Sequence, residues 1–152
     1  TQMTGITDLM LAKAPVIDEI LPAFLEFAGS AEETIIVAHN APFDLSFLKS
    51  AAKELDLDWP KFKTLDTVTI ARQVLSKEDV PNCKLSTLAQ FFGTKTEPNH
   101  RALDDAKATT EILHGLIERL GSFEVYNVDS LMEFAKTAAH IQRQNYWGLS
   151  ST

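Results

Sequence analysis

The sequence predicts an α/β domain in which two short parallel strands are flanked by helices. A short β-branched run at 34–38 and a second short strand-like run at 62–67 are separated by a segment with the apolar spacing of a helix. Further helical segments before and after them give the order α-β-α-β-α-α-α. This alternation is typical of parallel strands joined by crossover helices. The length of 152 residues suits one such domain.

The first predicted helix covers residues 15–27, with apolar side chains at positions 17, 20, 21, 24 and 25. Pro15 suits a helix start, whereas Pro22 is expected to kink the helix because proline lacks an N–H group. Gly29 with Ser30 is expected to end it.

The first strand is predicted at 34–38 and is broken by the run HNAP at 39–42. A second helix follows from Phe43, with a stripe of apolar residues at helical spacing. The stripe consists of Phe43, Phe47, Leu48, Ala51, Ala52 and Leu55.

The second strand, at 62–67, leads into a helix that runs to about residue 75. Residues 76–84 are predicted as a loop, and residues 85–92 as a short helix that Gly93 closes.

A long helix is predicted from residue 102 to 120, stopped by Gly121. Residues 122–128 resemble a linker, after which Asp129 or Ser130 is expected to cap a last helix. Its predicted inward residues are Leu131, Phe134, Ala135, Ala138 and Ile141.

Composition excludes several classes of protein. The formal net charge of −7 excludes a general electrostatic attraction to nucleic acid as the main mode of binding, although a local cation site is compatible with it. The single Cys83 excludes a disulfide framework and a cysteine-rich zinc site, and it fits a reducing compartment, so we expect a cytoplasmic protein. No apolar run approaches the ~18 residues of a membrane span, and no signal-type segment opens the chain.

Two carboxylates and a histidine stand at informative places. Asp44 follows a strand at the opening of a helix, which in α/β sheets is the edge where ligands bind. Asp105 lies in the first turns of the long helix, and His100 lies on the loop just before it. Carboxylates suit Mg²⁺ or Mn²⁺, and a nearby histidine can take a proton from water. Two such ions roughly 4 Å apart can support phosphodiester cleavage.

Simpler interpretations exist for each of these residues. Asp44 could serve only to cap its helix, and Asp105 only to complement the helix dipole. His100 could be an ordinary loop residue, and Asp104 is expected to be a solvated surface charge.

These motifs and their order along the chain resemble those of the DnaQ-like 3′–5′ exonucleases of the DEDDh group. That family has the ribonuclease H-like fold and includes the bacterial DNA polymerase III epsilon subunit. The similarity extends from about residue 3 to residue 120. The run IVAHNAPFDLSFL at 36–48 resembles the second family motif, and HRALDDA at 100–106 resembles the third. Residues 65–72 and the run LSTLA at 85–89 resemble the elements between them.

The resemblance implies that Asp44 and Asp105 are ligands of Mg²⁺ or Mn²⁺, with two ions in a complete site. It implies that His100 is the general base for the attacking water. Asp66 is expected to order the fold rather than to touch metal.

The resemblance also implies a set of substrate contacts. Asn40 and Phe43 would help to position the terminal nucleotide or the strand beside Asp44. Phe43 could stack on a base, and the alternative is an ordinary buried phenylalanine. Thr4, Gly5 and Ile6 would lie against the 3′ nucleotide.

One family feature is absent from these 152 residues, namely the first motif, an Asp-x-Glu on an N-terminal strand. We therefore expect a fold that lacks the N-terminal antiparallel strands and leaves an unpaired edge beside residues 35–38. Two short strands make a poor sheet alone, so missing strands would come from upstream or from a partner. The expectation is an N-terminally incomplete exonuclease domain at 1–120, with a linker and C-terminal helix at 121–152.

The resemblance implies a metal-dependent 3′–5′ exonuclease that acts on single-stranded or frayed DNA ends in proofreading or repair. Alternatives are a short-RNA exonuclease and a catalytically incomplete module that binds nucleic-acid ends or docks a polymerase. Expected partners are a DNA 3′ end, a DNA polymerase subunit and a fused nuclease domain, the last because the tail weakly resembles a linker to a GIY-YIG nuclease. A C-terminal helix packed on the domain is the favoured interpretation of the tail.

Overall fold

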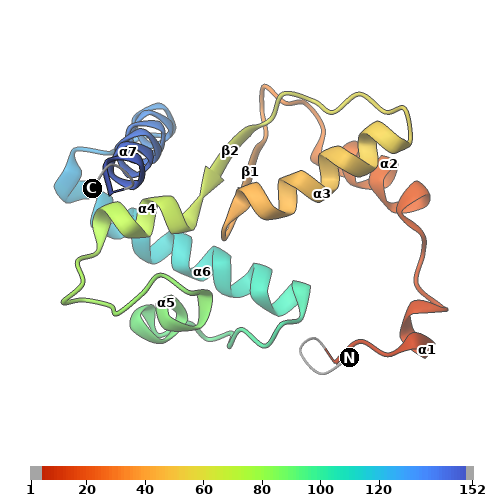
Figure 1. Ribbon diagram of the computed structural model, residues 1–152, viewed down its shortest axis with the longest axis horizontal. Helices are drawn as coiled ribbons and strands as arrows, with labels where there is room; N and C mark the ends of the chain where they lie inside the picture. Colours follow the sequence, from red (N-terminus) through yellow and green to blue (C-terminus); the bar gives the residue numbers. More distant parts are fainter. Residues whose placement is uncertain (1–4, 150–152) are drawn as a thin grey trace.

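The computed structural model of the protein describes residues 5–149 (Figure 1). The alternation of helices and strands confirms the predicted α/β class. The elements are α1 (Asp8–Leu11), α2 (Ile17–Ala28), β1 (Ile35–Ala38), α3 (Ala41–Glu54), β2 (Lys63–Asp66), α4 (Thr67–Val74), α5 (Leu85–Phe92), α6 (Ala102–Leu120), the 3-10 turn η1 (Gly121–Phe123) and α7 (Val128–Leu149).

The strands β1 and β2 pair in parallel, as predicted, and α3 is the crossover between them. Ile35 pairs with Lys63 and Ala38 with Asp66, so both strands end at the same edge. Within residues 5–149, these two strands form the whole sheet. Their shared end brings His39, Asn40 and Thr67 together, which is the basis of the site described below.

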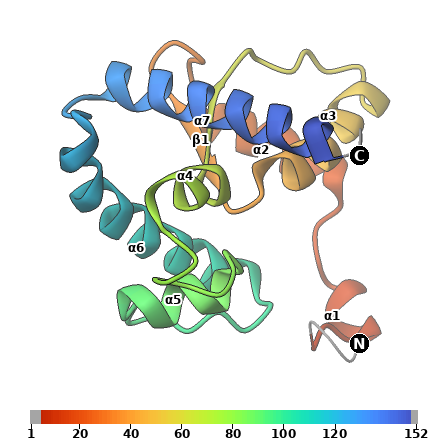
Figure 2. The ribbon, with the colours of Figure 1, turned by 60° about the vertical axis from the view of Figure 1, so that its left-hand side comes forward.

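The hydrophobic core lies on one side of the strands, among α4, α5, α6 and α7. Leu65 of β2, Ile70 of α4, Leu88 of α5 and two residues of α6, Ile112 and Leu116, are fully or almost fully buried in one cluster. Figure 2 shows α4 between α7 and the α5–α6 pair. The last helix therefore packs on the domain, as the favoured interpretation of the tail required.

The opposite side of the strands, formed by α2 and α3, buries fewer side chains (Figure 1). Phe43 and Phe47, which belong to the predicted apolar stripe of α3, are 60% and 63% exposed. Their rings contact each other edge to face, with centroids 5.0 Å apart. A stripe of this kind ordinarily faces a core, but here only Ala52 of the predicted set is buried, because α3 packs through its small residues.

One predicted helix end is confirmed and another is wrong. The helix α6 ends at Leu120 with Gly121 as its C-cap, as predicted, although Gly121 has helical angles and the chain continues as a 3-10 turn until Glu124, which has a φ of 58°. The last helix begins at Val128, capped by Asn127 rather than by Asp129 or Ser130. The Asn127 side chain accepts from the Ser130 N–H at 2.8 Å, and the Ser130 hydroxyl accepts from the Asn127 N–H at 3.1 Å. This is a reciprocal capping box.

Other expectations about helices have mixed outcomes. The helix α2 continues through Pro22 and ends at Gly29, whose φ is 69°. Gly93 closes α5 in the left-handed conformation, as predicted. Ile141, expected to face inward, is 37% exposed, whereas Ala135 and Ala138 are buried. Within residues 5–149, no helix has the length and apolar character that crossing a bilayer requires.

Candidate functional site

A cleft of about 700 Å³ opens at the shared end of the two strands. Four segments line it: His39 and Asn40 after β1, Val68 and Arg72 of α4, the Asn82–Ser86 segment that leads into α5, and a group at the start of α6. That last group comprises Pro98, His100 and Asp105. The cleft is thus assembled from parts of the chain that are far apart in sequence.

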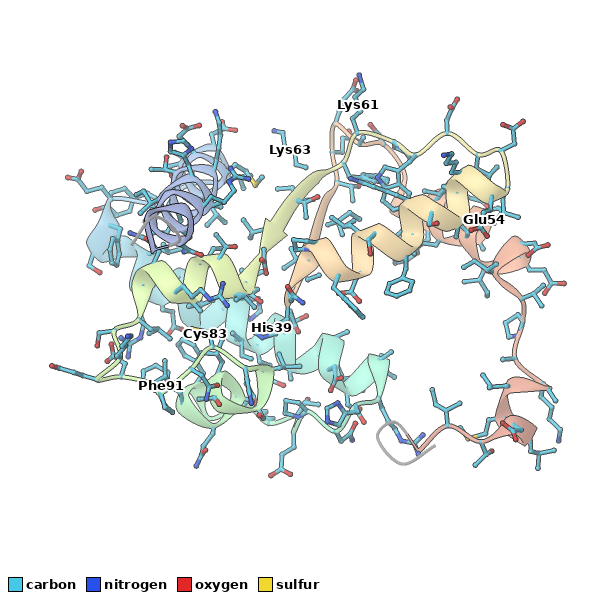
Figure 3. All side chains as sticks on the ribbon, viewed as in Figure 1. His39, Glu54, Lys61, Lys63, Cys83 and Phe91 are labelled. Carbon is cyan, nitrogen blue, oxygen red and sulfur yellow. The ribbon has the colours of Figure 1, made fainter. Side chains whose placement is uncertain are left out.

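His39 connects three of these segments. Its Nε2 lies 3.1 Å from the Cys83 carbonyl oxygen, and its Nδ1 lies 2.9 Å from the Thr67 hydroxyl oxygen. Because a carbonyl only accepts, Nε2 carries the proton, and in the neutral ring Nδ1 accepts from the Thr67 hydroxyl. Figure 3 shows His39 and Cys83 close to each other beneath α4.

The environment of His39 favours the neutral ring. Burial lowers the pKa of His39, and the charge of Arg72 lowers it further, against the opposing effects of the Asp66 carboxylate and the Cys83 carbonyl. A neutral His39 keeps both hydrogen bonds at neutral pH. In the sequence His39 is only part of the run HNAP, and its bridging role is not apparent there because Cys83 lies 44 residues away.

Asn40 follows β1 in the left-handed conformation, with a φ of 69°. The Asp66 carboxylate fixes it there: Oδ1 accepts from the Asn40 backbone N–H at 2.9 Å and from the Val68 N–H at 3.1 Å. Oδ2 accepts from the Thr69 hydroxyl at 3.0 Å. This agrees with the ordering role expected of Asp66.

The start of α6 is held by a local hydrogen-bond network. Asp105 is half-buried, and its Oδ1 accepts from the Asn99 backbone N–H at 3.1 Å. Asp104, expected to be a purely solvated charge, accepts from the Asn99 side-chain amide at 2.9 Å. These bonds fold the loop onto the helix and hold His100, an exposed residue with a φ of 63°, at the cleft.

The other predicted site residues lie outside the cleft lining. Asp44 is exposed in the first turn of α3, and no side-chain hydrogen bond caps that helix, so the simple capping interpretation has no support. Phe43 is exposed beside it.

The predicted contacts near the N-terminus are only partly described. Gly5 and Ile6 are exposed. A Cβ atom added at Gly5 would lie 3.9 Å from the Arg101 guanidinium, so this segment lies close to the start of α6 (Figure 1). Thr4 lies outside the described residues.

The structure therefore brings together only some of the predicted residues: Asn40, His100 and Asp105 share one cleft, and Asp44 does not. Among residues 5–149, no three His, Cys, Asp or Glu side chains are close enough to hold a metal ion together. The Asp105 carboxylate has the right chemistry for a hard divalent cation. The described donor set does not by itself form a metal site.

Comparison with known proteins identifies relatives of the chain. A family model described as "Exonuclease" matches residues 1–113. A Mycobacterium tuberculosis protein, whose name describes a bifunctional exonuclease/endonuclease, is 44% identical over 142 residues, which are 93% of this chain and 22% of that protein. PolC-type DNA polymerase III of Caldanaerobacter subterraneus is 45% identical over 131 residues, 86% of this chain and 9% of that protein. The corresponding Clostridium perfringens protein is 38% identical over 134 residues, 88% of this chain and 9% of that protein. The chain thus spans less than a quarter of each of these relatives.

Proposed function

The chain belongs to the DnaQ-like exonuclease family, and from this premise we propose that it removes nucleotides from the 3′ end of DNA by hydrolysing phosphodiester bonds. Family membership supports nuclease activity; the 3′–5′ direction and the roles of individual residues are our proposal. The observation that carries it is that Asn40, His100 and Asp105 line one cleft.

We assign the general base to His100. Its ring is exposed on a loop that Asp105 and Asp104 hold in place, so it can reach a water molecule at the cleft. The neutral imidazole takes a proton as the water oxygen attacks the terminal phosphorus, and the bond from phosphorus to the 3′ oxygen of the preceding nucleotide breaks. The product is a nucleoside 5′-monophosphate.

We assign metal binding to Asp105, which lines the cleft, and to Asp44 on the family resemblance alone, since Asp44 lies outside the cleft lining. The Asp105 Oδ1 accepts one hydrogen bond, and no bond from a described residue engages Oδ2, which leaves that oxygen open for a cation. A bound Mg²⁺ or Mn²⁺ supplies a Lewis acid and charge neutralisation in phosphodiester hydrolysis. Asn40 lines the same cleft and, through its side-chain amide, would orient the sugar or phosphate of the terminal nucleotide.

The test is degradation of a 5′-labelled single-stranded DNA by this chain, with Mg²⁺, with Mn²⁺ and with a chelator. The proposal expects a ladder of labelled products that shortens from the 3′ end, requires metal and stops at a 3′-phosphorothioate linkage. His100→Ala should lose the activity, whereas His114→Ala, which removes an exposed histidine of α6, should retain it. Immediate release of labelled mononucleotide would contradict the 3′–5′ direction.

Two alternatives are separable in the same assay. A matched RNA strand degraded faster than DNA would identify a short-RNA exonuclease. Binding of the strand without cleavage under any metal would identify an end-binding module and overturn the assignment of catalysis to this chain.

We further propose that the exonuclease unit, residues 1–120, acts beside a second catalytic unit. The names of the relatives support this: one describes a combined exonuclease and endonuclease, and the others describe DNA polymerases. Co-purification of the chain with a replicative polymerase or with an endonuclease domain would distinguish the two partners.

A further inference from the structure

The cleft carries opposite charges on different segments. Asp105 and His100 come from the start of α6, whereas the cations Arg72 and Lys84 come from α4 and from the residue that precedes α5. The assigned chemistry uses the first pair and leaves the second unexplained.

Neither cation is paired with an acidic side chain of the described residues. Among residues 5–149, the only ion pair joins Lys136 to Glu133 at 3.6 Å, and both of these lie on α7. No hydrogen bond joins the side chain of Arg72 or of Lys84 to another described residue. The chain has 21 acidic and 14 basic residues, so unpaired cations in one cleft run against its composition. They are available to an anionic ligand.

The backbone around both cations is held in place. Arg72 lies one helical turn after Val68 on the cleft face of α4, a helix that the Asp66 side chain caps. The Lys84 N–H donates to the Asn82 side chain at 3.0 Å.

A second set of contacts joins the two segments. The preceding carbonyl, that of Cys83, accepts from His39 at 3.1 Å. The Nδ1 of His39 lies 2.9 Å from the hydroxyl oxygen of Thr67, the first residue of the helix that carries Arg72. His39 therefore fixes the relative positions of the segments that carry the two cations.

We propose that Arg72 and Lys84 form a subsite for a backbone phosphate of the bound strand, at a linkage 5′ to the terminal one. The inference rests on the proposed function, because it assigns the terminal linkage to the segment that carries His100 and Asp105. A guanidinium binds phosphate oxygens through paired N–H donors, and an ammonium adds a point charge. A cleft of about 700 Å³ is within the range of sites that enclose small ligands. The subsite would bind one strand near its end. Such local phosphate binding is compatible with the overall net charge of −7.

The first experiment measures binding of a 5′-fluorescein oligothymidylate to the 152-residue chain by anisotropy, in chelator so that hydrolysis is absent. The double variant Arg72→Ala/Lys84→Ala should bind about tenfold more weakly, with a salt dependence shallower by roughly 0.7 logarithmic units per decade, the value for one phosphate contact on a single strand. The matched control is Lys61→Ala/Lys63→Ala, which removes the same charge at the far end of the strands (Figure 3). Equal weakening in both variants would overturn the subsite and indicate a nonspecific charge effect.

The second experiment replaces one phosphate at a time with a neutral methylphosphonate. The proposal expects one linkage, 5′ to the terminal one, at which neutralisation weakens binding to the wild-type chain, and expects that penalty to vanish in Arg72→Ala/Lys84→Ala. The charge-retaining variant Arg72→Lys/Lys84→Arg should keep the penalty. A penalty that persists in the alanine variant, or that falls only on the terminal linkage, would overturn the proposal.

These outcomes are separable from failure of the proposed function. A chain that shows the expected phosphate dependence but never cleaves would retain the subsite and lose the catalytic assignment. A chain that cleaves while the alanine variant binds like wild type would keep the catalytic assignment and lose the subsite. Because both cations are exposed, the variants should unfold at the wild-type temperature, which circular dichroism checks.

Discussion

The Asp66 Oδ1 accepts the backbone N–H of Asn40 at 2.9 Å, and this bond joins the carboxyl ends of the two parallel strands. The same oxygen caps α4 through the Val68 N–H at 3.1 Å. One carboxylate therefore fixes the residue that precedes α3 and the first turn of α4. Both helices take their position at the cleft from it.

Asp66→Ala is expected to destabilise the protein by about 2–3 kcal/mol, because it removes a helix cap and leaves the Asn40 N–H without its charged acceptor. Asp66→Asn keeps an acceptor oxygen and should cost less than about 1 kcal/mol. Urea unfolding of the three proteins measures the difference. Equal losses in both variants would show that the carboxylate charge, rather than the acceptor, does the ordering.

The half-buried position of His39 predicts a pH-dependent stability. Burial lowers the pKa of His39 below its ordinary value of about 6.5. The unfolded chain therefore binds more protons in the window below about pH 6.5, and stability falls as pH decreases through it. The contribution of His39 is complete above that window. The expected slope that it adds is at most about 1.4 kcal/mol per pH unit.

The measurement compares urea unfolding of wild type and His39→Gln between pH 7.5 and 5.5. The other histidines are present in both proteins, so the difference in slope reports His39. NMR titration of the His39 ring gives its folded-state pKa directly, even where His39→Gln proves too unstable to study. A ring pKa above the ordinary value would contradict the prediction.

The sequence predicts well what depends on local spacing and poorly what depends on long-range contact. Parallel pairing of the two strands follows from a crossover helix of adequate length, and the structure has it. The bridging role of His39 depends on Cys83, which lies 44 residues away, and no local pattern encodes that contact. The family motifs imply that Asp44 and His100 belong to one site, yet only His100 lines the cleft.

The errors have local physical causes. Gly121 ends α6 as predicted, but it has helical angles rather than a positive φ, because the chain continues as a 3-10 turn. The left-handed residue is Glu124 instead, three positions later. Of the stripe predicted on α3, Ala52 is buried and Phe43 is exposed, because α3 packs through the small residues Ala41 and Ala52.

Gly115 of α6 is a packing position rather than a flexible one. A Cβ there would collide with the Phe92 ring of α5. Gly115→Ala should therefore destabilise the protein by about 1–3 kcal/mol, although the same change in an open helix stabilises by about 0.5–1 kcal/mol. Gly121→Ala is the matched control, since its Cβ would meet no atom within 4 Å, and it should be neutral or stabilising.

Thermal unfolding of both variants tests the packing of α5 against α6. Phe92→Leu in the Gly115→Ala background should recover part of the loss, because it shortens the side chain that the new methyl group meets. A stabilising Gly115→Ala would show that Phe92 rotates away freely and that the two helices are not in tight contact.

Two substitutions of His100 separate the effect of backbone strain on stability from the effect of the lost imidazole on activity. Its φ of 63° lies in the left-handed region, where an L residue costs about 1–2 kcal/mol and glycine costs nothing comparable. His100→Gly should therefore raise the free energy of unfolding by about 1 kcal/mol relative to His100→Ala.

Both variants lack the imidazole, so nuclease activity should fall by about 10²- to 10⁴-fold in each. Added imidazole should restore part of the activity in both, since the base is missing and the rest of the site remains. A glycine variant with wild-type activity would exclude His100 as the base, and an alanine variant as stable as the glycine one would show that the loop relaxes out of the left-handed conformation.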